Sequence, residues 1–137
     1  MIVFADTSGL ATFFVDSQPG HLEAVEKVKT VCRVGGRLVT TNYVLAELTA
    51  LFTRPLRVGK THQIEYLRLI RTSDWIDNIG SDPVLEDAAW VYWEKHLDKE
   101  WSFVDCFSFT VMKSRGLNEA FTTDHHFEQA GFVRLLK

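Results

Sequence analysis

The sequence has few cysteines and prolines and no excess of positive charge. Its 137 residues include 2 cysteines and 3 prolines, and 15 lysines and arginines stand against 18 acidic residues, for a formal net charge of −3. Cys32 and Cys106 lie far apart and lack C-x-x-C spacing, which argues against a disulfide scaffold or a zinc site, so we expect buried free thiols. The negative net charge argues against binding of nucleic acid through a large positively charged surface, but it is compatible with a local basic strip.

The sequence also lacks a long hydrophobic run. No apolar stretch approaches the roughly 18 residues that suggest a membrane span, and the first apolar run is interrupted by Asp6 with no basic segment before it. We therefore expect a soluble, cytoplasmic protein with no membrane partner. With 46% hydrophobic and 24% charged residues, the chain suits one core and is too short for two. We predict a single domain over residues 1–137.

Strand and helix patterns alternate along the chain. Apolar spacing and turn signals predict helices over 8–14, 21–33, 42–54, 61–72, 83–97, 102–115 and 124–131. Strands are predicted over 2–5, 37–41, 75–79, 120–123 and 132–136. Such alternation implies crossover connections between parallel strands. The predicted fold class is therefore α/β, a three-layer α/β/α domain with a parallel sheet of four or five strands.

Two aspartates follow predicted strands. Asp6 ends the apolar run "IVFA", and Asp124 ends "AFTT". Ligands of open α/β sheets bind beyond the carboxyl ends of the strands, so both acids are candidates for one site. Each aspartate has an alternative role as the cap of the helix that follows it.

Glu47 and Asp105 are acids in apolar helices. Glu47 lies at the margin of an apolar stripe and has no lysine or arginine three or four residues away. A partly desolvated carboxylate there needs a cation, a proton or a metal, unless the side chain simply reaches the surface. Asp105 fits a capping box with Ser102, which explains it without any function, although capping and metal binding are compatible.

These acids stand in motifs that resemble those of PIN domains. "FADTSGL", Glu47 within an apolar helix, "SFVDCFSFTVMKSRG" and "AFTTDHHFEQAGF" occur in the order and at the separations of that family, across nearly the whole chain. Many PIN domains are metal-dependent ribonucleases, including the VapC toxins of toxin–antitoxin pairs. The resemblance implies that the catalytic and metal-binding acids are Asp6, Glu47, Asp105 and Asp124, and that Thr7, Ser102 and Thr122 support them. His125 and His126 lie in a variable stretch and receive no role.

An all-oxygen ligand set indicates the cofactor. Carboxylates without cysteine or a histidine pair suit Mg²⁺ or Mn²⁺, and we expect one or two ions. Such ions promote hydrolysis of a phosphodiester, so the predicted enzyme is an RNA-cleaving hydrolase. We expect Asp6 and Asp105 to be direct ligands and Asp124 to complete the site. Glu47 would ligate a metal or orient the attacking water.

Two further features concern partners. Arg54, Arg57 and Lys60 form a candidate strip for the RNA backbone, although a solvated loop explains them equally. The helix predicted over 83–97 carries two apolar stripes, one of them formed by Trp90, Trp93 and Leu97. The extra stripe predicts contact with a second copy of the chain in a homodimer or with an antitoxin protein, unless other helices of the domain cover it.

Two other functions remain open on the sequence alone. A haloacid dehalogenase-like phosphatase also places an aspartate after its first strand, but Ser8 stands where that family has a second aspartate. An RNA- or protein-binding module would use the acids only for capping and ion pairs. Metal-dependent cleavage separates the ribonuclease from such a module.

Overall fold

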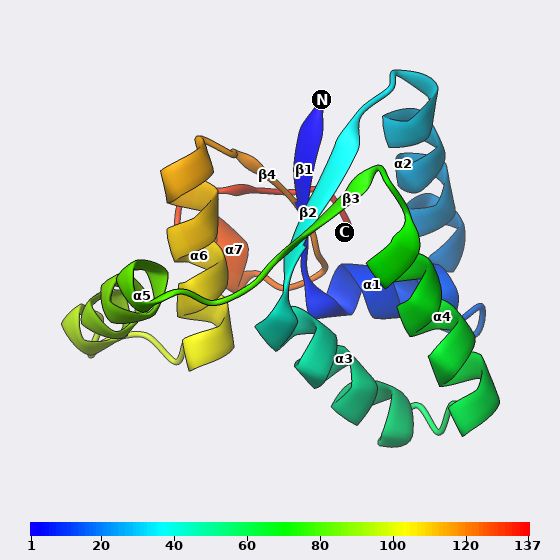
Figure 1. The fold of residues 1–137 in the computed structure, drawn as a ribbon, viewed down its shortest axis with the longest axis horizontal. Helices are drawn as coiled ribbons and strands as arrows, with labels where there is room; N and C mark the ends of the chain where they lie inside the picture. The colour runs from blue at the N-terminus through cyan, green and yellow to red at the C-terminus, as the bar shows by residue number, and fades with distance from the viewer.

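A five-stranded parallel sheet forms the centre of the computed structural model, which describes residues 1–137 (Figure 1). The strands are β1 (Ile2–Ala5), β2 (Arg37–Thr41), β3 (Ile76–Ile79), β4 (Glu119–Phe121) and β5 (Val133–Arg134). Their order across the sheet is β3-β2-β1-β4-β5. Three residues of the central strand β1, Val3 to Ala5, are completely buried. A strand covered on both faces reads as a continuous apolar run, which is the pattern of "IVFA".

Seven helices surround the sheet. They are α1 (Thr7–Phe14), α2 (His21–Arg33), α3 (Asn42–Thr53), α4 (Lys60–Thr72), α5 (Pro83–Lys95), α6 (Phe103–Arg115) and α7 (His126–Gln129). In Figure 1, α1, α2 and α4 lie on one side of the sheet, and α5, α6 and α7 lie on the other. The predicted α/β class with a parallel sheet is confirmed. None of the helices combines the length and the hydrophobicity needed to cross a bilayer.

The strand order reverses between β1 and β4. The chain builds the sheet outward from β1 through β2 to β3, and then returns to add β4 and β5 on the other side of β1. Helix α1 approaches the end of β4 so closely that a Cβ added to Gly9 would lie 2.0 Å from the carbonyl oxygen of Phe121. Only glycine fits there. The first turn of α1 is thereby brought against the point where β4 ends.

Several predicted boundaries differ from the structure. The predicted strand over 120–123 stops at Phe121, and the one over 132–136 is reduced to Val133–Arg134. Helix α5 ends at Lys95, short of the predicted end at residue 97. The expectation that both cysteines are buried is wrong for Cys32, which is exposed on α2, whereas Cys106 is buried.

Candidate active site

A cavity of about 310 Å³ opens at the edge of the sheet where β1 and β4 end. Its lining residues are Asp6, Thr7, Ser8, Glu47, Leu51, Glu100, Ser102, Asp105, Asp124 and His126. Five of these are acids, and none is a lysine or an arginine. The cavity lies at the reversal of strand order, which is the usual place for a ligand in an open α/β sheet.

Asp6 is a buried acid of this cavity, with only 4% of the residue exposed. It occupies the N-cap position of α1, but its side chain makes no capping hydrogen bond, so the capping alternative is wrong for this residue. Its Oδ2 atom instead accepts hydrogen bonds from the hydroxyls of Ser8, at 3.1 Å, and Thr122, at 2.9 Å. The carboxylate is held by the protein and remains directed to the cavity that it lines.

The same two hydroxyls position Asp124. Ser8 Oγ accepts the backbone N–H of Thr123 at 3.0 Å, and Thr122 Oγ1 accepts the backbone N–H of Asp124, also at 3.0 Å. These bonds hold the turn that follows the end of β4 at Phe121. Asp124 therefore reaches the cavity from a turn three residues beyond the strand, and does not follow it directly as the sequence predicted.

Glu47 is linked to α1 through Thr7. The Thr7 hydroxyl donates a 2.6 Å hydrogen bond to Oε1 of Glu47. Glu47 is exposed as a whole residue, but its carboxylate contacts a threonine that is only 5% exposed. Glu47 therefore lies at the mouth of the cavity, and its carboxylate is held by a residue of the interior.

Asp105 completes a capping box at the start of α6. Its backbone N–H donates to Ser102 Oγ at 3.0 Å, and its Oδ2 accepts the backbone N–H of Ser102 at 3.2 Å. The residue is 8% exposed and lines the cavity. The predicted capping role is thus present together with a place in the acidic cavity, and Ser102 sets the direction of Asp105.

The acids share one pattern of hydrogen bonding. Asp6 and Asp105 use Oδ2 for the side-chain and capping bonds described above, and Glu47 uses Oε1. The second oxygen of each of these carboxylates has no side-chain partner. Each of these three side chains is therefore held through one carboxylate oxygen, and all three line the cavity.

Burial without a cation changes the acidity of the site. Burial raises the pKa of Asp6 to about 7, the hydrogen bonds from Thr122 and the Thr7 backbone oppose the shift, and the charges of Asp105 and Glu47 add to it. Burial also raises the pKa of Glu47 and of Asp105. For Asp105, the hydrogen bonds from the Ser102 backbone and from His126 oppose the shift. Three acids of one cavity thus resist ionisation together.

The sequence matches the PIN domain family model over residues 3–133. The chain belongs to the PIN domain family. VapC20 of Mycobacterium tuberculosis, described as a 23S rRNA-specific endonuclease, is 33% identical over 99 residues, which are 72% of this chain and 72% of VapC20.

Two solved structures share the PIN architecture. The crystal structure of M. tuberculosis VapC20, described as a sarcin-ricin loop cleaving toxin, has a TM-score of 0.84 and 30% sequence identity, and the match covers 100% of both chains. FitAcB from Neisseria gonorrhoeae has a TM-score of 0.62 at 18% identity, and the match covers 98% of this chain and 95% of that one. The second likeness supports the fold alone.

The donor set of this PIN domain fits a hard divalent cation. Carboxylate and hydroxyl oxygens from β1, α3, α6 and the turn after β4 meet in a cavity without a protein cation. Mg²⁺ and Mn²⁺ favour such oxygen ligands. A cation would stabilise the ionised carboxylates against the burial, and the smaller mutual repulsion, that raise their pKa values. The residues that would hold it are Asp6, Asp105 and Asp124, with Glu47 at the cavity mouth.

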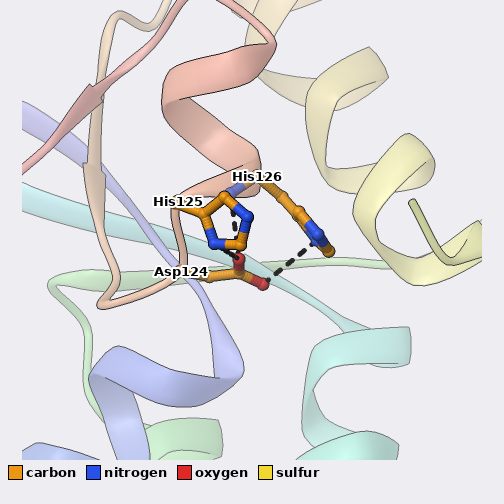
Figure 2. Close-up of side chains that lie close together, drawn as sticks. All are labelled: Asp124, His125 and His126. Atoms are coloured by element: carbon orange, nitrogen blue, oxygen red, sulfur yellow. Dashed lines mark hydrogen bonds and ion pairs between the residues drawn. The ribbon is translucent and has the colours of Figure 1, made fainter. Parts of the chain in front are cut away.

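Three polar lining residues were not assigned from the sequence. Ser8 follows Asp6 at the second position, Glu100 precedes α6, and His126 follows Asp124 at the second position. Ser8 and His126 could have been identified from the sequence only because each lies two positions after a predicted site acid. Figure 2 shows His126 with Asp124 and His125, a group in which one ligand atom of each residue lies within 4.8 Å of the others.

The predicted RNA strip lies outside this cavity. Arg54 and Arg57 belong to the connection between α3 and α4, and Lys60 is the first residue of α4. None of the three lines the acidic cavity. Lys60 instead lines a second cavity together with Arg68 and Arg71 of α4. A contact of these residues with RNA stays a prediction.

Proposed function

We propose that this PIN domain is a metal-dependent endoribonuclease that hydrolyses RNA phosphodiester bonds. The observation that carries the proposal is the concentration of acids, with no lysine or arginine, in the cavity at the strand-order reversal. A binding module has no need for buried carboxylates that lack cations, because their burial costs stability. Family membership removes the basis for a haloacid dehalogenase-like reaction, and Ser8 binds Asp6 where that family needs a second acid.

The substrate we infer is a structured loop of ribosomal RNA. VapC20, which is similar over most of this chain, is described as a 23S rRNA-specific endonuclease and a sarcin-ricin loop cleaving toxin. We extend that substrate class to this chain, together with a role as the toxin of a toxin–antitoxin pair whose partner is an antitoxin protein. Access to ribosomal RNA would place the protein in the cytoplasm.

The chain's own residues divide the chemical work. When bound, Mg²⁺ or Mn²⁺ would supply positive charge that polarises the phosphate and lowers the pKa of the attacking water. Asp6, Asp105 and Asp124 would hold one or two ions from fixed positions. Glu47, which is exposed at the mouth and is held by Thr7, would orient the attacking water.

Contacts with RNA beyond the reacting phosphate would come from the α3–α4 region. Lys60, Arg68 and Arg71 of α4 line one cavity there, and Arg54 and Arg57 lie in the connection that precedes α4. Lysines and arginines of this kind bind phosphates without reading sequence. Neutralising Lys60 should therefore raise KM a few-fold and leave kcat unchanged.

A protein partner is indicated by α5. Trp90, Trp93 and Leu97 have exposed fractions of 42%, 44% and 94%. The domain covers this outer stripe only in part, since the Trp90 ring stacks on that of Phe103 at a centroid distance of 3.8 Å. We propose that a homodimer or the antitoxin covers the rest. Trp93→Glu tests this surface, because a charge there should weaken self-association or antitoxin binding while leaving RNA cleavage intact.

The decisive experiment is cleavage of labelled RNA by the purified protein with Mg²⁺, Mn²⁺ or EDTA. The substrates are a ribosomal stem-loop of the sarcin-ricin type and a linear RNA of the same composition. Asp6→Asn should abolish cleavage, whereas Asp98→Asn, a matched change at a side chain that is 75% exposed, should not. Cleavage that persists in EDTA or in Asp6→Asn would reject the proposed reaction.

A further inference from the structure

His126 connects two acids that come from different parts of the chain. Its Nδ1 atom lies 3.1 Å from Oδ2 of Asp105 and 3.5 Å from Oδ2 of Asp124. Its backbone N–H donates a 2.9 Å hydrogen bond to Oδ1 of Asp124. In Figure 2 the His126 ring and the Asp124 carboxylate are joined by a dashed line, and the ring points toward that carboxylate. One residue therefore contacts both acids, through its ring and its backbone.

The position of this histidine is fixed by its neighbour. Phe127 is completely buried, and its ring lies 4.9 Å from that of Phe109 on α6 and 6.2 Å from that of Phe4 on β1. Phe127 therefore packs against α6, which carries Asp105, and against β1, which leads into Asp6. Because Phe127 follows His126 directly, it fixes the backbone from which the imidazole reaches both acids.

We propose that His126 is a positioning residue that fixes the carboxylates of Asp105 and Asp124 relative to each other for a divalent cation. This inference rests on the proposed function, because it assumes that these acids bind the metal. The ring acts with its proton on Nδ1, where it donates to Asp105 Oδ2. That oxygen also accepts the Ser102 N–H, so Asp105 Oδ1 stays available to a cation.

The type of side chain suits this role. A lysine or arginine in the same place would bring a permanent charge that competes with the cation for the carboxylates. An imidazole that carries its proton on Nδ1 offers a hydrogen bond without a permanent charge. Partners that orient metal ligands typically contribute about 10-fold to 100-fold in metal affinity.

His125 provides a matched control from the adjacent position. Its side chain is 65% exposed, and its Nδ1 lies 3.7 Å from Oδ1 of Asp124. It has no contact with Asp105, and it does not line the acidic cavity. Two neighbouring histidines therefore differ in whether they connect the acids.

The test measures Mn²⁺ binding without RNA. Free Mn²⁺ is counted by electron paramagnetic resonance during titration of the wild type, His126→Leu, His126→Asn and His125→Leu. Asparagine keeps an N–H donor near the place of Nδ1, whereas leucine removes it. We expect His126→Leu to weaken Mn²⁺ binding by about 10-fold to 100-fold. His126→Asn should bind within a few-fold of the wild type, and His125→Leu should be unchanged.

Four outcomes would overturn the inference. Unchanged affinity in His126→Leu would mean that the ring does not position the acids, and tighter binding would mean that the ring occupies the place of the cation. An equal loss in the leucine and asparagine variants, with a shifted visible spectrum of bound Co²⁺, would identify a direct ligand. A wild type that binds no Mn²⁺ would reject the role outright.

Two further measurements separate failure of folding and failure of the proposed function from failure of this inference. The melting temperature of each metal-free variant shows whether it is folded, and the asparagine variant provides the comparison if leucine unfolds the protein. A wild type that binds Mn²⁺ with the expected order of variants, but cleaves no RNA, would reject the ribonuclease and retain the positioning role.

Discussion

Asp6, which follows the central strand, and Asp77, which lies within an edge strand, have opposite electrostatic surroundings. Asp77 lies on the edge strand β3, where Arg37 of β2 binds both its oxygens, with Nη2–Oδ1 at 2.5 Å and Nε–Oδ2 at 3.2 Å. This guanidinium lowers the pKa of Asp77. Asp6 follows the central strand β1, and burial together with the charges of Asp105 and Glu47 raises its pKa to about 7.

The difference separates an acid with a structural role from the acids that we propose bind a cation. A buried carboxylate normally has a cation of the protein beside it, since an unpaired charge is costly to bury. Asp77 has such a cation although it is only partly buried, whereas the far less exposed Asp6 has none. Perturbed acids in a cavity without a protein cation are the pattern of a functional site.

The largest expected effect is that of Asp6→Asn, which should act on activity and stability in opposite directions. Loss of this proposed metal ligand should lower cleavage by more than about 100-fold, which exceeds the usual effect of residues that only orient ligands. The amide keeps the shape of the carboxylate and its acceptor for Ser8 and Thr122, while the buried charge disappears. Without metal at pH 8, urea unfolding should show that the Asp6→Asn variant is more stable than the wild type. A variant that is less stable and still active would contradict the comparison.

The second prediction concerns pH and metal. The pKa of Asp6 is raised in the folded state from its ordinary 3.8 to about 7. The stability that protonated Asp6 contributes is therefore complete below pH 3.8 and is lost as the pH rises through about 7. The shift corresponds to about 4 kcal/mol at most. Asp105 and Glu47 act in the same direction. In EDTA, the free energy of unfolding attributable to these acids should fall between pH 5 and pH 8.

Metal should reverse this loss. Mn²⁺ should raise the melting temperature more at pH 8 than at pH 5, because the cation binds the ionised acids. Calorimetric scans at both pH values, with and without MnCl₂, measure the difference. Asp6→Asn is the control, since its pH profile should be flatter. An equal response to Mn²⁺ at both pH values would show that these acids do not bind it.

The sequence predicted the features that are set by local patterns. "IVFA" indicates β1 because both faces of a central strand are covered, and "SFVD" indicates the start of α6 because a capping box involves residues three apart. The short strand β5 was overestimated because only Val133 and Arg134 pair with β4, although the apolar pattern extends further. The end of such a strand depends on which residues of the neighbouring strand pair with it. The sequence of the strand itself does not give this information.

The parts of the site that were missed depend on distant contacts. Oγ of Ser8 lies 2.9 Å from Oγ1 of Thr122, which is 114 positions away in the chain, and His126 reaches Asp105 across 21 positions. In "DHH" the two histidines are equivalent as sequence. Only packing of Phe127 into the core directs one toward the acids and leaves the other in solvent.

The third prediction removes a hydroxyl from the acidic cavity. Thr122→Val keeps the volume of a completely buried residue, but it takes a hydrogen bond from Asp6 and an acceptor from the Asp124 N–H. An unsatisfied buried group costs about 1–3 kcal/mol, so denaturant unfolding should show a loss of that size. Cleavage should fall, because Asp124 loses its support. Thr122→Ser, which keeps the hydroxyl, should restore both properties.

The smallest effect is expected for Asp77→Asn. The ion pair with Arg37 is partly exposed, with side-chain exposures of 40% for Arg37 and 36% for Asp77, and screening limits such pairs to about 0.2–1 kcal/mol. The variant should be slightly less stable at low salt, and the loss should shrink at 1 M NaCl. Because the pKa of Asp77 is lowered in the folded state, its ion pair stabilises the protein above the ordinary pKa of aspartate and ceases to do so as the pH falls. The difference in stability between Asp77→Asn and the wild type should therefore disappear at low pH. A double-mutant cycle with Arg37→Gln isolates the pair, while Mn²⁺ affinity and cleavage should stay at wild-type values. If Asp77→Asn weakened Mn²⁺ binding as Asp6→Asn does, the presence of a protein cation would not distinguish structural acids from functional ones.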